Sequence, residues 1–402
     1  MGKVGTVRNG VRKAGPVGAA KKSRGLKGDP AVLRAALLAW YDANRRDLPW
    51  RRSSDPYAIW ISEIMLQQTR VAVVVERFVA FMLRFPSVQK LAQAEGQEVL
   101  ALWSGLGYYR RARMLHQAAQ IVVAELGGVM PTGSAELRRL PGIGTYTAAA
   151  IASIAHGEAV AVVDGNVERV LCRVAGWEAG GAKGATELRR QVQALAGELL
   201  SPARPGDFNQ AMMELGATVC LPRNPQCLVC PLAVGCKTLG EHKTAPRAAM
   251  QSRAVGHALA VRTGKDGGAS KEEILLEQRA AEQTVMSGLW ELPRLKDSVV
   301  PEGDLRMAVR HAIMQVNYDV RVRTVFEDDV EALTVIGGTR RWVPVSEAAD
   351  MALTGLARKV LTRAQLISAA TRNAHDATAA AGDVAGRDIA GPNIAGENKV
   401  VF

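Results

Sequence analysis

Four cysteines in a short stretch constrain this chain more than any other feature. Cys220, Cys227, Cys230 and Cys236 span seventeen residues with the spacing C-x6-C-x2-C-x5-C. Because the loops between them are short, four thiolates can close around one inorganic centre. Zinc also accepts four thiolates, although two closely spaced pairs would suit a zinc ribbon better. The clustering indicates a metal centre in a reducing compartment rather than a disulfide framework. The fifth cysteine, Cys172, lies in an apolar helical pattern and is expected in the core.

The chain is long enough for two or three domains and basic enough to favour a polyanionic partner. It has 402 residues and a formal net charge of +12. Residues 1–28 hold eight Lys or Arg and no acid, so charge alone is weak support for nucleic acid. No apolar run reaches the roughly 18 residues of a membrane span. The basic N-terminus lacks the apolar segment of a secretory signal. We expect a cytoplasmic protein, nucleoid-associated if bacterial, with an organellar transit peptide as the open alternative.

Gly and Pro divide residues 30–240 into a series of helical patterns. Asp55 and Pro56 look like an N-cap and a first helical residue, opening a helix to about Ala80. Further helices are expected at 31–43, 87–103, 110–126, 134–140, 145–157, 166–175, 185–200 and 207–219. After residue 240 the pattern becomes alternating and β-branched, with turns between the segments. This predicts strands at 257–262, 274–279, 320–326 and 341–345 and helices at 302–314 and 354–367.

These patterns suggest a helical domain followed by an α+β domain. The Gly/Lys/Arg-rich start and the Ala/Gly/Asp-rich end have no periodicity and are expected to be disordered. The expected segments are a basic arm (1–29), a helical core (30–240), a linker (241–252), an α+β domain (253–367) and a tail (368–402).

A glycine-rich turn joins two of the expected helices. Pro141-Gly142-Ile143-Gly144 separates the segments 134–140 and 145–157. Gly142 and Gly144 permit positive φ and close backbone approach. The turn leaves amide N–H groups at a helix N-terminus, which can hold a nucleic-acid phosphate, while Ile143 should anchor the turn in the core. On these four residues alone, an ordinary helical hairpin is the favoured interpretation.

Two carboxyl groups occur in contrasting surroundings. Asp164 precedes the helix 166–175, where the helix dipole and free amides stabilise a carboxylate. Glu63 has three apolar side chains among its four neighbours one helical turn away, including Trp60 and Leu66. Its carboxyl should therefore lose solvation and keep its proton to higher pH. Such a pair is the usual division between a general acid and a stabilising anion. The alternatives are a plain N-cap and a solvated surface glutamate.

Residues 30–240 resemble the helix-hairpin-helix DNA glycosylases that carry an iron–sulfur cluster, and within them the MutY family of adenine glycosylases. The matching stretches are Leu48–Arg51, Asp55–Tyr57, Ser62–Thr69, Gly105–Tyr109, Leu140–Tyr146, Val163–Asn166, Met213–Gly216 and the cysteine run. The resemblance implies a mostly α fold: a glycosylase core made of a six-helix domain and an Fe–S helical domain, with a C-terminal α+β Nudix-like domain. It also implies a [4Fe–4S] cluster on the four clustered cysteines.

The implied activity is removal of adenine mispaired with 8-oxoguanine or guanine in double-stranded DNA, by a monofunctional glycosylase of base excision repair that we expect to be a monomer. In this family Glu63 would protonate the flipped adenine at N7. Asp164 would stabilise the oxocarbenium ion at C1′, with a transient covalent adduct as an alternative. Tyr146 and Asn166 would position these groups. The adenine pocket would be lined by Leu48, Trp50, Arg51 and, more weakly, Gln210. Duplex contacts would come from Leu66, Gln68 and Tyr108 as wedges and from Gly142 and Gly144 at a phosphate.

Two other functions are alternatives to this one. The related endonuclease III enzymes carry a lysine where this chain has Tyr146, and that amine forms a Schiff base and cuts the strand. No lysine occurs between Lys90 and Lys183, so we expect little or no β-lyase activity. An Fe–S DNA-binding protein without catalysis is the non-enzyme alternative. It would not need Glu63 and Asp164 beside a polyanion.

Residues 253–366 resemble the C-terminal Nudix-like domain of the same family, most clearly at Gly288–Pro293. The glutamate cluster of catalytic Nudix enzymes is absent, so no pyrophosphatase activity is expected. Relatives read 8-oxoguanine through a Phe-Ser-His turn that follows an Arg-His pair. Here the pair is followed by Ala312 and Ile313, and Met314 and Gln315 replace Ser and His. Because Met lacks the hydroxyl donor, we expect a weaker preference for 8-oxoguanine over guanine.

Overall fold

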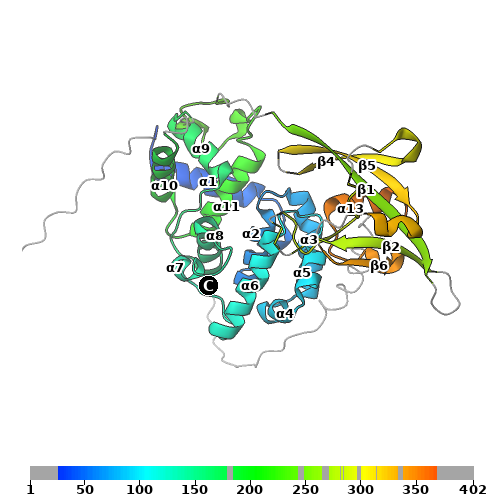
Figure 1. Cartoon of the computed structure of the whole chain (residues 1–402). Coiled ribbons are helices and arrows are strands. Elements are labelled where there is room, and N and C mark those ends of the chain that lie inside the picture. Colours follow the sequence, from blue (N-terminus) through cyan, green and yellow to red (C-terminus); the bar gives the residue numbers. More distant parts are fainter. Residues whose placement is uncertain are drawn as a thin grey trace, which may run out of the picture.

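The computed structural model describes residues 26–178, 184–242, 249–264, 271–280, 282–283, 285–296, 300–313, 315–333 and 338–368. Within these residues a helical part (30–235) is followed by a sheet part (251–363), and the two lie side by side (Figure 1). Nearly all of the expected basic arm and tail, and also Met314, lie outside the described residues.

The helical part follows the predicted pattern closely. Asp29 and Asp55 cap the first turns of α1 and α2 through their side chains, with proline at the first helical position of each. The helices are α1 (Pro30–Asn44), η1 (Pro49–Arg51), α2 (Pro56–Leu66), α3 (Val71–Arg84), α4 (Val88–Gln93), α5 (Gly96–Leu102), α6 (Arg110–Glu125), α7 (Ser134–Leu137), α8 (Thr145–His156), α9 (Gly165–Ala175), α10 (Ala185–Leu199), α11 (Pro205–Thr218), η2 (Cys227–Val229) and η3 (Ala233–Gly235).

These helices form two hydrophobic cores. The first packs residues of α2 to α8 around fully buried side chains such as Trp60, Phe81 and Trp103. The second joins α1 to α9, α10 and α11 around Leu37 and Leu215. Because α8 contacts both α2 and α11, residues of α2, α8, α9 and α11 meet where the two cores adjoin. The mostly α fold with two helical bodies confirms the predicted architecture of this part.

The helix predicted from Asp55 to Ala80 is wrong, because the chain breaks between α2 and α3. Gln68 has φ of +56°, and the guanidinium of Arg111 binds the carbonyl of Gln67 at 2.6 Å. Arg111 also donates to the hydroxyl of Thr69. The α2 C-terminus is thus completed by a side chain of α6 rather than by a local stop signal. The predicted helix 87–103 similarly divides into α4 and α5.

The sheet part is a mixed sheet with strand order β3-β2-β1-β5-β4, and β6 also pairs with β2. Strands β1 and β5 run parallel, and the other pairs are antiparallel. Helix α13 packs on one face through Val360 and Leu361, against Val309 and Val320. Its elements are β1 (Gln251–Gly264), β2 (Lys271–Gln278), β3 (Trp290–Glu291), η4 (Glu302–Asp304), β4 (Leu305–Ile313), β5 (Val316–Val325), η5 (Glu327–Ala332), β6 (Arg340–Pro344), α12 (Val345–Ala348) and α13 (Gly355–Arg363).

The helix predicted at 302–314 is also wrong, because these residues form η4 and the edge strand β4. Their apolar residues fall at every second position, which is the period of a strand. From α13, Lys359 donates to the carbonyl of Arg310 at 2.7 Å and Arg363 donates to that of Ala308 at 3.2 Å. These side chains satisfy backbone acceptors of the edge strand, which otherwise would be open to pairing with another chain.

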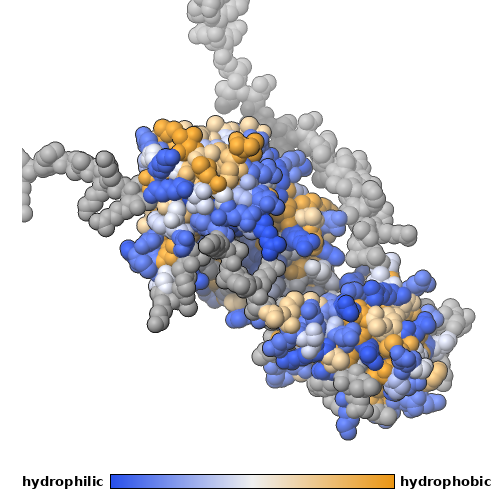
Figure 2. All heavy atoms as spheres, turned by 90° about the horizontal axis from the view of Figure 1, so that it is seen from above, coloured by the Kyte–Doolittle hydropathy of each residue, from blue (hydrophilic) through white to orange (hydrophobic). Residues whose placement is uncertain are grey.

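The two parts share polar and apolar contacts. The hydroxyl of Tyr109 donates to the carbonyl of Leu353 at 3.2 Å, and Arg358 Nε donates to Ser104 Oγ at 2.9 Å. Leu289, from the sheet part, belongs to the first helical core. Seen from above, a larger and a smaller body meet with both hydrophilic and hydrophobic side chains on their surfaces (Figure 2). Among the described helices, none has the length and apolar character needed to cross a membrane.

Candidate active site

Helix α2 carries Glu63 into the interior, where its side chain is almost completely buried. Tyr146, in the first turn of α8, donates a hydrogen bond to Glu63 Oε2 at 2.7 Å. Burial raises the pKa of Glu63 to about 7, because the loss of solvation outweighs the lowering effect of the Tyr146 hydroxyl. Burial also raises the pKa of Tyr146 well above its usual range. Near neutral pH, the site therefore holds a neutral phenol beside a carboxyl that can keep or give up its proton.

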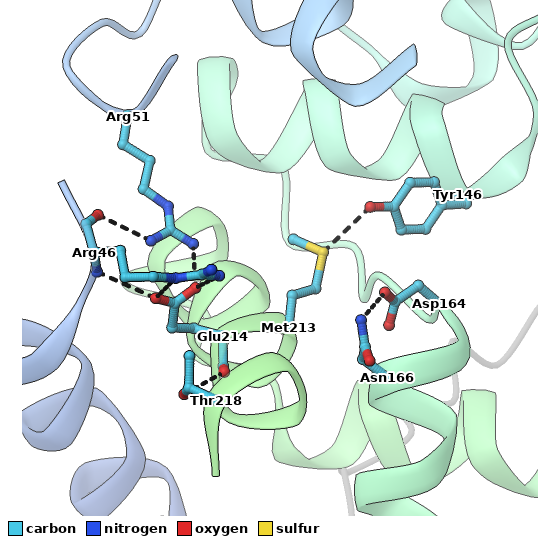
Figure 3. A network of polar contacts seen from close by, with 8 residues as sticks. All are labelled: Arg46, Arg51, Tyr146, Asp164, Asn166, Met213, Glu214 and Thr218. Carbon is cyan, nitrogen blue, oxygen red and sulfur yellow. Dashed lines mark hydrogen bonds and ion pairs between the residues drawn. The ribbon is translucent and has the colours of Figure 1, made fainter. Parts of the chain in front are cut away.

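Asp164 occupies the N-cap of α9. Its Oδ1 accepts from the backbone N–H of Val167 at 2.7 Å, and its Oδ2 accepts from Asn166 Nδ2 at 3.0 Å. Both oxygens thus receive donors that stabilise a negative charge. Figure 3 shows the Asp164 and Asn166 side chains together, facing Met213 of α11. A Cβ on Gly216 would lie 2.7 Å from the Cβ of Asn166, so the missing side chain lets α11 approach the start of α9.

A single cavity of about 510 Å³, here called the catalytic cavity, joins these groups. Its volume lies within the usual range of ligand pockets. The predicted site residues that line it are Leu48, Trp50, Arg51, Glu63, Leu66, Gln68, Tyr146, Asp164, Asn166 and Gln210. Both the acid and the N-cap carboxylate therefore border the same space, together with apolar side chains.

Three predicted DNA-contacting residues, Tyr108, Gly142 and Gly144, do not line the catalytic cavity. Tyr108 and Gly142 line a second space of about 810 Å³, the adjoining cavity, which shares Gln67 and Gln68 with the catalytic cavity. Residues of the sheet part, including His311, complete the adjoining cavity. The two glutamines between α2 and α3 thus border two spaces, one lined by the helical part alone and one lined by both parts.

The glycine-rich turn has the geometry expected of it. Gly142 has φ of +77°, and a Cβ there would lie 2.9 Å from the Cβ of Met114, so both conformation and space call for glycine. Ile143 is buried in the first core, as predicted. Gly144 is the N-cap of α8 and contributes no side-chain cap. The first amides of α8 are therefore available to an anion.

A buried ion-pair network beside the catalytic cavity was missed from the sequence. The side chain of Glu214, 1% exposed, accepts from Arg46 Nε at 2.7 Å and from Arg51 Nη2 at 2.9 Å (Figure 3). Burial works to raise the pKa of Glu214, but the hydrogen bonds from Arg46 and Arg51 prevail and lower it to about 2. The Arg51 guanidinium is thus held by Glu214. The sequence does carry a signal for this network. An acid lies within the apolar pattern of 207–219, and arginines lie on both sides of Leu48.

The four clustered cysteines line one small pocket with Arg173. Arg173 Nη1 donates to Cys220 Sγ at 3.3 Å. Within the described residues, no group of three or more His, Cys, Asp or Glu side chains is arranged to hold one metal ion. Cys172 is buried in the second core, as predicted.

Comparison with known proteins finds relatives of the helical part. Residues 61–196 match the model of the HhH-GPD superfamily base excision DNA repair protein. An adenine DNA glycosylase of Homo sapiens is 52% identical over 215 residues, covering 51% of this chain and 39% of that protein. An adenine DNA glycosylase of Arabidopsis thaliana is 46% identical over 231 residues, covering 51% and 36%. About half of this chain is therefore similar to adenine DNA glycosylases, and residues 61–196 match the HhH-GPD superfamily.

The similarity to adenine DNA glycosylases covers only part of those proteins. The aligned region spans about two fifths of the length of these relatives. Among solved structures, a thermostable thymine-DNA glycosylase superposes with a TM-score of 0.47 at 30% identity, covering 52% of this chain and 96% of its own. The family match includes Glu63, Tyr146 and Asp164, and therefore three of the groups that border the catalytic cavity.

Proposed function

We propose that this chain is a monofunctional adenine DNA glycosylase that removes adenine mispaired with 8-oxoguanine or guanine. One observation carries the proposal: Glu63, with a pKa of about 7, and the hydrogen-bonded carboxylate of Asp164 border the same cavity. A neutral carboxyl can donate a proton to a base, and a carboxylate can stabilise the cation left on the sugar. Binding alone requires neither group beside a polyanion.

The reaction follows from this division of roles. Glu63 donates its proton to N7 of the flipped adenine, and Tyr146 holds the Glu63 carboxyl in place. As the bond between N9 and C1′ breaks, its electron pair moves to the base. The positive charge that forms on the sugar faces Asp164, which Asn166 and the α9 backbone orient. Water then adds at C1′ and loses a proton, leaving an abasic site.

The duplex would approach through the hairpin and the segment between α2 and α3. The open amides at Gly144 suit one phosphate. Gln68 and Tyr108 both have positive φ, of +56° and +47°, and Tyr108 is half-exposed. Strain of this kind is often kept at functional sites. We propose that these two side chains enter the duplex where the bases part, so that adenine occupies the catalytic cavity and its partner base the adjoining cavity.

We propose a domain division at 30–240 and 253–367, with the second unit Nudix-like and without catalysis of its own. A monomer suffices, because both cavities are built from one chain. As a DNA repair enzyme, the protein would act in the cytoplasm on the nucleoid if its source is bacterial.

The four clustered cysteines would hold a [4Fe–4S] cluster. Their common pocket, the short loops between them and the nearby guanidinium of Arg173 fit four thiolates around one group. The cluster would be structural, tying η2 and η3 to the second core. The test compares Cys230→Ser with Cys172→Ser: the first should lose bound iron and thermal stability, and the second should keep its iron. Equal iron in both variants would exclude this ligand set.

The activity is tested by single-turnover release of adenine from duplexes with A opposite 8-oxoguanine and A opposite guanine. Glu63→Gln keeps the shape of the side chain but cannot serve as an acid, so the rate should fall by a factor of about 10² to 10⁴ while duplex affinity stays. Glu76→Gln, exposed on α3, is the matched control and should react like the parent. An inactive parent on both duplexes, or an active Glu63→Gln variant, would refute the proposal.

The lyase alternative is tested separately by borohydride trapping. Tyr146 occupies the position where a Schiff-base amine would be needed and is bonded to Glu63. We therefore expect no covalent protein–DNA product and no strand cleavage after adenine release. A trapped complex would assign the chain to the bifunctional class.

A further inference from the structure

Met213 of α11 places a sulfur atom in the candidate active site that the proposed chemistry does not use. Its Sδ accepts a hydrogen bond from the Tyr146 hydroxyl at 3.2 Å (Figure 3). The side chain is partly buried and lines the catalytic cavity together with Tyr146 and Glu63. This cavity of about 510 Å³ is far larger than the roughly 30 Å³ that one water molecule occupies. A molecule as small as hydrogen peroxide therefore has room to reach the Met213 side chain.

The Tyr146 hydroxyl has one proton to donate and two acceptors within reach. Glu63 Oε2 lies 2.7 Å from the hydroxyl oxygen, and Met213 Sδ lies 3.2 Å from it. Because a hydroxyl donates a single O–H, the two acceptors compete for it. A thioether sulfur is a weak acceptor, so the carboxyl keeps the larger share of this hydrogen bond. The balance between the two acceptors thus depends on the chemical state of the sulfur.

Oxidation of the sulfur would reverse this balance. With hydrogen peroxide, one oxygen atom passes to Sδ, the sulfur gives up two electrons, and the O–O bond breaks to leave one water molecule. The product, methionine sulfoxide, is polar where the thioether was apolar. Its oxygen carries a much larger negative charge than a thioether sulfur. It therefore competes strongly with Glu63 for the proton of the Tyr146 hydroxyl.

We propose that Met213 is an oxidation site that controls the acid of the catalytic cavity, because its sulfoxide takes the Tyr146 hydrogen bond away from Glu63. The inference rests on the proposed function, in which Glu63 is the proton donor. The titratable and charged groups that act on the Glu63 carboxyl come from three elements: Tyr146 of α8, Asp164 of α9 and Arg51 of η1. Of these three groups, Tyr146 is the one that hydrogen-bonds to Met213.

The oxidised enzyme should have a different pH profile. Burial raises the pKa of Glu63 to about 7, and the hydrogen bond from Tyr146 works against that rise by stabilising the carboxylate. Once the sulfoxide holds the hydroxyl, this pKa should rise further. Because the acid form is needed, the falling limb of the rate should move to higher pH. The plateau below the limb should drop at least about fivefold, because Glu63 becomes a weaker acid and loses the bond that holds it.

The test measures single-turnover adenine release over a pH series, before and after the full chain is treated with hydrogen peroxide. Mass spectrometry of peptides measures the oxygen added at Met213. The treated parent should show both the lower plateau and the shifted limb. Met213→Leu, which has no sulfur at this position, should show the same profile before and after treatment. Tyr146→Phe, which has no hydroxyl to lose, should keep its limb at the same pH.

Met250→Leu is the matched control, because Met250 is exposed and lines neither cavity. This variant should respond to peroxide like the parent. If treated Met213→Leu lost as much activity as the treated parent, the inference would be overturned. It would also be overturned by an unchanged profile in a parent whose Met213 is fully oxidised, or by a Met213 that stays reduced while Met250 is oxidised. A parent that releases no adenine before treatment would instead refute the proposed function, and mass spectrometry would still show whether peroxide reaches Met213.

Discussion

Glu63 and Asp164 differ in what surrounds each carboxyl. Glu63 has lost its solvation and receives one hydrogen bond, from Tyr146. Asp164 is only partly buried and receives two, from a helix amide and an amide side chain. One environment favours the neutral acid and the other supplies donors to a negative charge, which supports the proposed assignment of acid and anion.

The pH dependence of adenine release should follow the protonation of Glu63. The acid form is needed, so the rate should be level below pH 7 and fall as pH rises through about 7. The Tyr146 hydroxyl lowers this pKa, so Tyr146→Phe should move the falling limb to higher pH and also lower the plateau. Single-turnover rates over a pH series check this. Tyr57→Phe removes a 2.8 Å hydrogen bond in the same helix away from the catalytic cavity and should leave the limb in place. If the fall in rate occurred at the same pH in Tyr146→Phe as in the parent, the assignment of Glu63 as the titrating acid would be contradicted.

Glu214 should contribute to stability through Arg46 and Arg51. Glu214→Gln leaves two guanidiniums without their carboxylate, so the free energy of unfolding at pH 7 should fall by about 3 kcal/mol. The parent should have a higher free energy of unfolding than the variant above the unfolded pKa of a glutamate. This difference should vanish as pH falls from there towards about 2. Urea denaturation at several pH values measures this. Glu187→Gln, which breaks an exposed pair with Arg190, should leave stability nearly unchanged. If both variants lost the same free energy of unfolding, burial would not explain the contribution of Glu214.

At the scale of elements, the close approach of α11 to α9 fixes the position of the α9 N-terminus, which carries Asp164 and Asn166. Gly216→Ala would normally stabilise a helix by about 0.5–1 kcal/mol. Here the new Cβ would lie 2.7 Å from Asn166, so it should displace Asn166 and Asp164 and reduce adenine release at least about tenfold. Gly197→Ala in α10 meets no atom within 4 Å and should keep full activity. Single-turnover kinetics measure adenine release by both variants, and circular dichroism checks that both keep their helices. Full activity of Gly216→Ala would contradict this prediction, because α11 would then have shifted without displacing the start of α9.

Local signals predicted most elements, and the errors have tertiary causes. The capped starts of α1 and α2 were visible as Asp-Pro pairs. The end of α2 was not, because Arg111 of α6 supplies the groups that complete it. Strand β4 was misread although Met307, Val309 and His311 already showed a two-residue period.

The candidate site also shows that contacts between residues distant in sequence could not be predicted. Glu63 and Asp164 could be found from their neighbours in sequence, because burial on one helix and capping of another are local properties. Glu214 could not be placed, because its partners lie more than 160 residues away in the chain. Assignment of the adjoining cavity to both parts likewise required the fold.

At the scale of the whole molecule, the two cavities differ in which parts of the chain line them. The catalytic cavity is lined by the helical part alone, whereas the adjoining cavity is closed by β4 and the start of α13. Bonds between the parts, such as Arg358 to Ser104 and Tyr109 to Leu353, therefore set how β4 lies relative to Gln68 across the adjoining cavity. Under the proposed function, chemistry at adenine and recognition of its partner would then vary independently.

This independence gives a prediction for Arg358→Gln. Its Nε bond to Ser104 crosses between the parts, and its other bonds hold the carbonyls of Ala349 and Met351 within the sheet part. Loss of the bridge should reduce the rate ratio between 8-oxoguanine and guanine duplexes about fivefold, while adenine opposite guanine is released at nearly the parent rate. Arg363→Gln, in the same helix but bonded only to β4 among the described residues, should keep the ratio. If Arg358→Gln slowed both duplexes equally, the parts would be coupled through catalysis itself, and the separation of cavities would have to be abandoned.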